Sequence, residues 1–154
     1  MNSSNKVAED DHASVRAWFQ RWGACVREVD MQGARPLFAD DVIGFGTYKD
    51  FVDGLDALCD GQWTSIWPTI ADFEFRLDTL RTQLSADRCM AVGMILWSST
   101  GFAADGAPYD RPGRATVTLT RASPESAWLG RHTHFSLFPH ERKLSFGDSA
   151  RTGS

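Results

Sequence analysis

Two histidines and a serine alternate along residues 128–139 (WLGRHTHFSLFP), a segment whose composition predicts a β-strand. Alternate residues of a strand point to opposite faces of its sheet, so the segment has two different sides. One side would carry Trp128, Gly130, His132, His134 and Ser136. The other would carry Leu129, Arg131, Thr133, Phe135 and Leu137. A row of Trp, His and Ser, without the charges typical of a solvated face, predicts that the first side lines a cavity for water or a ligand.

The chemistry that these residue types offer is proton transfer at neutral pH. His134, with His132 beside it, is the candidate general acid or base, and Ser136 could fix the tautomer of the ring. The alternative is that one histidine makes a structural hydrogen bond and the other lies at the pocket rim. A metal would need a third ligand from another strand, such as Asp72 or Glu74. We therefore predict no metal site.

Tryptophans are the next candidates, because broad aromatic faces bind flat apolar molecules. The residues predicted to contact a ligand are Trp18, Trp22, Phe45, Trp63, Trp67, Trp97 and Trp128. For any one tryptophan the alternative is packing in the core. Arg114 could hold a carboxylate or phosphate through a bidentate pair, or it could face outward with Thr116 and Thr118 at a dimer surface.

The composition indicates one globular domain and excludes several classes of function. The chain has 154 residues, of which 42% are hydrophobic and 23% charged, and this suits a single core. A net charge of −4 without a basic run argues against binding to nucleic acid. We find no phosphate-binding loop, dinucleotide fingerprint or nucleophile elbow, so we predict no cofactor. The absence of a long apolar run or a secretion signal favours no membrane association and a cytoplasmic protein.

The predicted elements place helices before a sheet. Apolar residues recur at helical spacing from Val15 to Val26, and Asp11 or Ser14 could cap this helix. The further predicted segments are a short helix over 31–38, a strand over 42–45, a helix over 51–63 and long strands over 70–83, 89–102, 114–121 and 128–139. This order predicts an α+β fold in which a strongly curved antiparallel sheet wraps the long N-terminal helix. We expect one domain over 10–147, with flexible ends at 1–9 and 148–154.

The same order of elements, with particular short motifs, resembles the nuclear transport factor 2-like superfamily. The motifs are LFADDV at 37–42, FGT at 45–47, GLD at 54–56, and the His-x-His-x-Ser strand at 128–136. Within the superfamily the chain is similar to the SnoaL-like and ketosteroid isomerase-like branch, and to the association domain of calcium/calmodulin-dependent kinase. The resemblance implies a cone-shaped, cystatin-like fold with a deep pocket between helix and sheet. It also implies a homodimer through the outer face of the sheet.

The chain departs from the ketosteroid isomerase where that enzyme does its chemistry. Alignment on residues 39–41 would place the general base at Gly46 and the oxyanion-hole tyrosine near Trp22. We find no acidic residue over 114–120 to serve as the second acid. Proton abstraction beside a carbonyl needs a base and a donor for the enolate, so steroid isomerisation is not expected.

The sequence therefore predicts a pocket for a small, largely apolar organic molecule, with His134 as the principal polar contact. Two alternatives stay open. The first is a cofactor-independent isomerase, cyclase or dehydratase in which His134 is the acid or base. The second is a non-catalytic assembly domain that associates through Leu129, Phe135 and Leu137.

Overall fold

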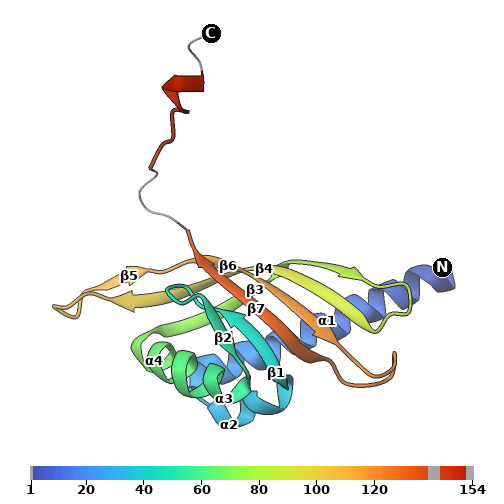
Figure 1. Ribbon diagram of the computed structural model, residues 1–154. Helices are drawn as coiled ribbons and strands as arrows, with labels where there is room; N and C mark the ends of the chain where they lie inside the picture. Colours follow the sequence, from blue (N-terminus) through green and yellow to red (C-terminus); the bar gives the residue numbers. More distant parts are fainter. Residues whose placement is uncertain (1, 139–142, 152–154) are drawn as a thin grey trace.

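The computed structural model describes residues 2–138 and 143–151. One long helix, α1 (Ser3–Glu28), lies across one face of a curved sheet, and three short helices gather at one end of the molecule (Figure 1). The helices are α2 (Met31–Ala34), α3 (Leu55–Ala57) and α4 (Thr64–Ile66). Tighter or wider turns are η1 (Arg35–Leu37), the π-helical η2 (Leu58–Trp63), η3 (Trp67–Thr69) and η4 (Ser149–Arg151). The predicted α+β fold is confirmed.

The strands are β1 (Phe38–Phe45), β2 (Phe51–Asp53), β3 (Ala71–Leu84), β4 (Met90–Phe102), β5 (Pro108–Asp110), β6 (Gly113–Thr120) and β7 (Leu129–Leu137). They form one sheet in the order β2-β1-β7-β6-β4-β3, and β5 pairs with β4. The sheet was expected to be antiparallel throughout, but β1 and β7 pair in parallel, so it is mixed. The helix predicted over 51–63 starts only at Leu55, because residues 51–53 pair with β1. Residue 139 of the last predicted strand lies outside the described residues.

Helix α1 has the predicted apolar face, but it begins well before the expected caps. Asn2 caps the helix by accepting a hydrogen bond from the Ser4 amide, and residues 3–10 extend it as an exposed stretch. No proline or glycine interrupts residues 3–10, so the helix can continue to Asn2. The helix ends at Val29, whose left-handed φ of 55° turns the chain and whose N–H bonds back to the last turn.

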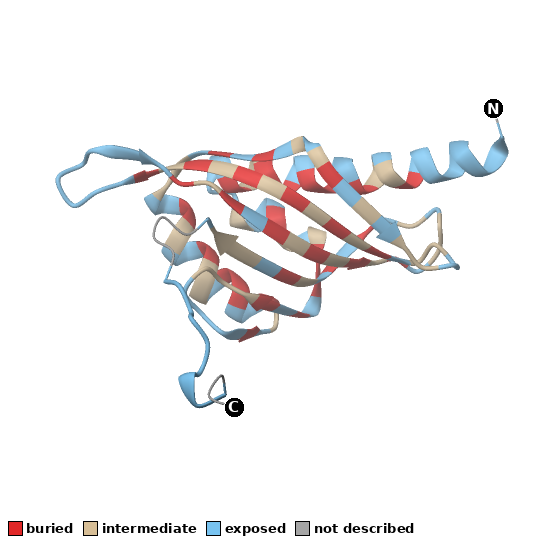
Figure 2. Ribbon diagram, turned by 90° about the horizontal axis from the view of Figure 1, so that it is seen from above, coloured by how far each residue is buried: buried red, intermediate tan, exposed pale blue. Residues whose placement is uncertain are grey.

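The core lies between this helix and the sheet. Alternate residues of the central strands are buried, which gives the striped pattern along β4 and β6 in Figure 2. At Gly93 the backbone of β4 comes so close to the helix that a Cβ would lie 2.6 Å from the Phe19 ring. Trp18 is fully buried, and its indole N–H donates to the Leu37 carbonyl over 3.0 Å. This close contact fixes the helix against the sheet and leaves little room near the N-terminal half of the core.

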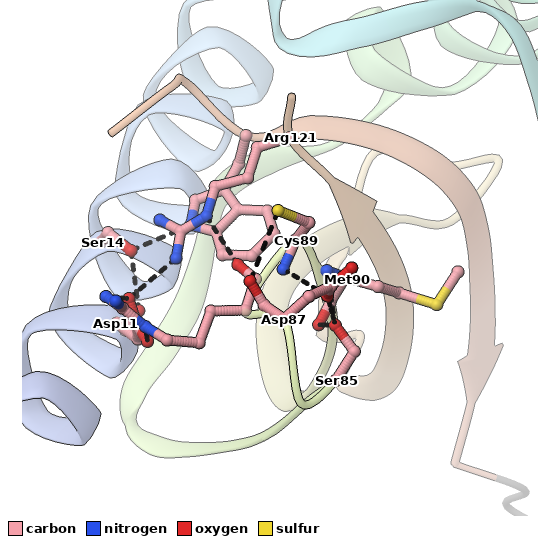
Figure 3. Close-up of polar contacts among 9 residues, drawn as sticks. Asp11, Ser14, Ser85, Asp87, Cys89, Met90 and Arg121 are labelled. Atoms are coloured by element: carbon pink, nitrogen blue, oxygen red, sulfur yellow. Dashed lines mark hydrogen bonds and ion pairs between the residues drawn. The ribbon is translucent and has the colours of Figure 1, made fainter. Parts of the chain in front are cut away.

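A buried ion-pair cluster joins the first half of α1 to the sheet, at the residues just before β4 and just after β6 (Figure 3). The Asp11 carboxylate accepts from Arg88 Nε at 2.7 Å and from Arg121 Nη2 at 2.8 Å. The hydrogen bond from Arg88, together with that from Arg121, holds the pKa of Asp11 below its usual value. The Arg121 guanidinium also lies 3.9 Å from the ring centroid of Trp128, whose N–H donates to Ser14 Oγ over 2.8 Å. Asp11 is therefore an anchor between elements and not a helix cap.

Candidate functional site

The pocket lies between the second half of α1, the helical segment 58–69 and the inner face of the sheet. The cavity has a volume of about 50 Å³, and the empty space between its walls, including open solvent at its mouth, amounts to about 500 Å³. The apolar lining consists of Trp22, Val26, Trp63, Ile66, Trp67, Ile70, Phe73, Trp97 and Phe135. The polar lining consists of Thr47, Gln62, Arg111 and Thr133. An aromatic cleft with a few polar groups is the usual form of a site for a small organic molecule.

Local sequence explains why these side chains meet. Trp22 and Val26 lie four residues apart on α1 and so share one face. The π-helical turn η2 brings Gln62 and Trp63 to the cleft, and the Trp63 ring stacks on Trp67 with centroids 4.7 Å apart and planes at 17°. Single π-helical turns are frequent at functional sites, because they reorient side chains that an α-helix would place elsewhere.

Glycines leave the space that the larger side chains occupy. A Cβ at Gly46 would lie 2.8 Å from Gln62 Nε2. A Cβ at Gly113 would lie 2.3 Å from the Trp97 ring and equally close to a backbone carbonyl. The space beside Gly46, which aligns with the general base of the ketosteroid isomerase, is therefore occupied by the side-chain amide of Gln62.

Three buried polar atoms of the pocket residues have no hydrogen-bond partner among the described residues: Trp22 Nε1, Trp97 Nε1 and Gln62 Oε1. Buried polar atoms in native proteins are nearly always paired, and an unpaired one costs about 1–3 kcal/mol. The contrast within the chain is clear, because the buried indole N–H groups of Trp18 and Trp128 each have a protein acceptor. Two donors and one acceptor on residues that line the cavity are therefore left unpaired.

Arg111 is the charged residue of the pocket. It is only 9% exposed, and neither a hydrogen bond nor an ion pair joins its guanidinium to any residue of the described chain. Its Cζ lies 5.4 Å from the ring centroid of Trp97, which is a cation–π contact. Burial lowers the pKa of the Arg111 guanidinium. Arginine nevertheless stays protonated in proteins, so the pocket carries a positive charge without a matching negative one.

The prediction that the histidines and Ser136 line the cavity is wrong. Gly130 does face the interior, where a Cβ would lie 2.6 Å from the Phe38 ring. Between Gly130 and His132, however, Arg131 is an extra residue, because β6 pairs Leu119 with Gly130 and Thr118 with His132. Such a β-bulge reverses the faces of all residues beyond it. His132, His134 and Ser136 therefore lie on the outer face, and Thr133 and Phe135 line the pocket.

The outer-face residues contact one another. The Phe45 ring centroid lies 5.3 Å from that of His132 and 5.2 Å from that of His134. His132 Nδ1 is 2.6 Å from the Ile43 carbonyl, and since a carbonyl only accepts, Nδ1 is the donor. On the same face Arg114 Nε donates to Ser136 Oγ over 3.0 Å. Arg114 thus has the outward orientation that was one of its two expected placements.

Four of the predicted ligand contacts, Trp22, Trp63, Trp67 and Trp97, come together in the pocket. Trp18 and Trp128 belong to the packed half of the core, and Phe45 and Arg114 belong to the outer face. Sequence reasoning missed the polar contacts Arg111, Gln62 and Thr133, and it placed Phe135 outside. The glycines at 44 and 46 are the signal that could have indicated Gln62, because both lie close to its side chain. Arg111 has no such signal in the sequence.

The helix, the curved sheet and the cleft between them define the class of protein as a cone-shaped α+β domain with an interior pocket. The family model of the SnoaL-like domain matches residues 15–141, and the chain belongs to that family. No curated protein matches the sequence. Across the described residues, none of the helices has the length and apolar character that crossing a membrane requires.

Solved structures share the fold at low sequence identity. A nuclear transport factor 2-like superfamily protein from Salmonella enterica serovar Typhimurium is 16% identical, with a TM-score of 0.73 over 92% of this chain and 99% of that one. A ketosteroid isomerase-like protein from Erwinia carotovora atroseptica is 15% identical, with a TM-score of 0.70 over 82% and 95% of the two chains. A protein with a cystatin-like fold from Caulobacter vibrioides is 14% identical, with a TM-score of 0.69 over 85% and 92%. These likenesses show the fold, and function has to be argued from the site.

Proposed function

We propose that this chain is a ligand-binding domain whose interior pocket takes a small organic molecule with a flat, apolar body. The observation that carries the proposal is the set of unpartnered buried atoms, Trp22 Nε1, Trp97 Nε1 and Gln62 Oε1, around one aromatic cavity. A core selected for stability alone would pair or exclude such atoms, because each unpaired one is costly. A ligand that accepts from the indoles and donates to the amide would offset that cost.

Binding without proton transfer fits the pocket better than catalysis. Among the lining residues in the described part of the chain there is no Asp, Glu, His, Cys, Lys or Tyr that could serve as a general acid or base. His134, the predicted acid or base, lies on the outer face, where it cannot reach a ligand held inside the same subunit. Its catalytic role and that of His132 stay predictions, as does the cytoplasmic location.

The outer face supports a second proposal, the expected homodimer. Ile43 is 41% exposed and Phe51 65% exposed, and both lie beside the cluster of Phe45, His132 and His134. A contiguous apolar and aromatic area on a sheet face favours protein association. Sedimentation of the wild type and of Phe51→Asp tests this, because a dimer that uses this face should dissociate in the variant. A variant that sediments like the wild type would contradict it.

The ligand-binding proposal is tested by calorimetric titration with small aromatic probes in matched pairs: benzoate with benzamide, and phenylacetate with phenylacetamide. At least one probe should bind the wild type with one-to-one stoichiometry. Thr47→Phe fills the cleft from its loop and should abolish that binding, whereas Thr64→Phe, at an exposed position on α4, should not. Absence of binding by all four probes, or equal binding by the Thr47 variant, would contradict the proposal.

A further inference from the structure

Arg111 distinguishes this pocket from an ordinary aromatic cavity. Arg111 is a buried residue, and buried arginines normally have a carboxylate or several carbonyl acceptors, because an unpaired buried charge is among the costliest arrangements in a protein. The other buried arginine of the described chain, Arg121, follows this rule and pairs with Asp11 at 2.8 Å. Among the described residues Arg111 has the Trp97 ring as its cation–π partner and the phenols of Tyr48 and Tyr109 in its neighbourhood, but no carboxylate. The missing counter-charge therefore has to come from elsewhere.

The donors near Arg111 match the needs of a carboxylate. The guanidinium offers a planar fork of N–H groups that binds two carboxylate oxygens side by side. The Trp97 ring lies next to it, and Trp97 and Trp22 flank Phe135 with centroid distances of 5.9 and 5.3 Å. Both tryptophans line the cavity, and neither indole N–H has a hydrogen-bond partner among the described residues. The terminal amide of Gln62 can turn to present its Nε2 as a further donor.

We propose that the pocket selects organic monocarboxylates, with the carboxylate bound by Arg111 and the indole N–H groups of Trp22 and Trp97. This rests on the proposed ligand-binding function and names the chemical class of the ligand. The apolar body of the molecule would lie against the stacked pair Trp63 and Trp67 toward the open mouth.

Charge and size favour a monocarboxylate over other anions. Arg111 is the one cation among the described lining residues, so a single negative charge neutralises the site, whereas a phosphate dianion would leave an excess charge buried. The cavity volume of about 50 Å³ leaves room for a small head group and not a large one, so the body of the ligand would extend into the open mouth. The aromatic side chains of the pocket favour a ligand with an apolar body, which inorganic anions lack.

The test measures the affinity of each carboxylate probe relative to its neutral amide at pH 7. In the wild type, benzoate and phenylacetate should bind at least about tenfold more tightly than benzamide and phenylacetamide, as expected for hydrogen bonds to a charged group. Arg111→Gln should reduce the ratio to within about twofold, and Arg111→Lys should keep part of it. Arg114→Gln, which removes an arginine from the outer face, is the matched control and should leave the ratio unchanged.

The possible results distinguish the carboxylate proposal from the ligand-binding proposal. If the amides bind the wild type as tightly as the carboxylates, or if the preference survives Arg111→Gln, the carboxylate assignment is wrong while ligand binding stands. If inorganic phosphate competes as strongly as benzoate, selectivity for organic carboxylates is also wrong. If none of the four probes binds, both proposals fail. Loss of folding in Arg111→Gln would abolish amide binding as well, and Arg111→Lys then provides the comparison.

Discussion

Replacing Arg111 with methionine should make the unliganded protein more stable. Arg111 is 9% exposed and its guanidinium has no acceptor in the described chain, so folding removes much of its water without replacing the lost hydrogen bonds. The Arg111 nitrogens are not among the fully buried unpaired atoms, so the penalty should be near that of a buried polar group, about 1–3 kcal/mol, and not that of a fully buried charge. The cation–π contact with Trp97, at 5.4 Å near the outer limit for such contacts, returns about 0.5–1 kcal/mol. Methionine keeps most of the apolar contacts made by the buried methylene groups of Arg111, so the free energy of unfolding should rise by about 1 kcal/mol.

Urea denaturation in a buffer without carboxylates measures this gain as a higher midpoint at an unchanged slope. In a thermal scan the melting temperature should rise by about 2–4 °C for a domain of this size. Arg114→Met on the outer face is the control and should change stability by less than about 0.5 kcal/mol. A loss of 1 kcal/mol or more in Arg111→Met would refute the reasoning, because it would mean that the guanidinium is well paired inside the folded protein.

Three further perturbations probe other parts of the structure. Asp11→Asn leaves two arginines without their carboxylate and should lower the free energy of unfolding by about 3 kcal/mol at pH 7 in urea. Because the folded pKa of Asp11 lies below the unfolded value of about 3.9, its contribution is complete at neutral pH and is lost as the pH falls through the lowered pKa. The free energies of unfolding of the wild type and the variant should therefore converge at low pH, and a constant difference down to about pH 2 would contradict this. Gly113→Ala puts a Cβ 2.3 Å from the Trp97 ring, so stability should fall by about 2 kcal/mol and probe affinity should weaken; unchanged titrations would disprove the close contact. His134→Ala should leave probe affinity within about twofold, whereas a tenfold loss would mean that the histidine reaches the ligand.

The fold could be predicted from local patterns because those patterns cover whole elements. The apolar spacing from Val15 to Val26 defines one helix face, and the alternation in 114–121 defines the inward row of β6. An Asp-Gly dipeptide favours a tight turn, and Asp105-Gly106 lies in the turn of the β4–β5 hairpin, with a φ of 84° at Gly106. The parallel pairing of β1 and β7 could not be foreseen, because it joins segments that are distant in the sequence.

The site was predictable only in part, for two physical reasons. Tryptophan is highly buried on average, and all six tryptophans of this chain are buried, so Trp22, Trp63, Trp67 and Trp97 were found by residue type. The histidines were misplaced because one bulged residue, Arg131, exchanges the two faces of the strand, and no alternation pattern marks such a bulge. Arg111 was missed because it follows a short hairpin strand, and only the packing of the folded sheet brings it over Trp97.

The most direct test of a carboxylate inside this pocket is the indole N–H region of a ¹⁵N-labelled spectrum during titration with benzoate. The tryptophans provide their own controls, because the indoles of Trp18 and Trp128 already donate to Leu37 O and Ser14 Oγ. We predict that the Trp22 and Trp97 indole protons shift downfield with saturation, as expected for new hydrogen bonds to a charged acceptor, while those of Trp18 and Trp128 stay in place. A titration in which Trp22 and Trp97 do not move while benzoate binds elsewhere would contradict the account.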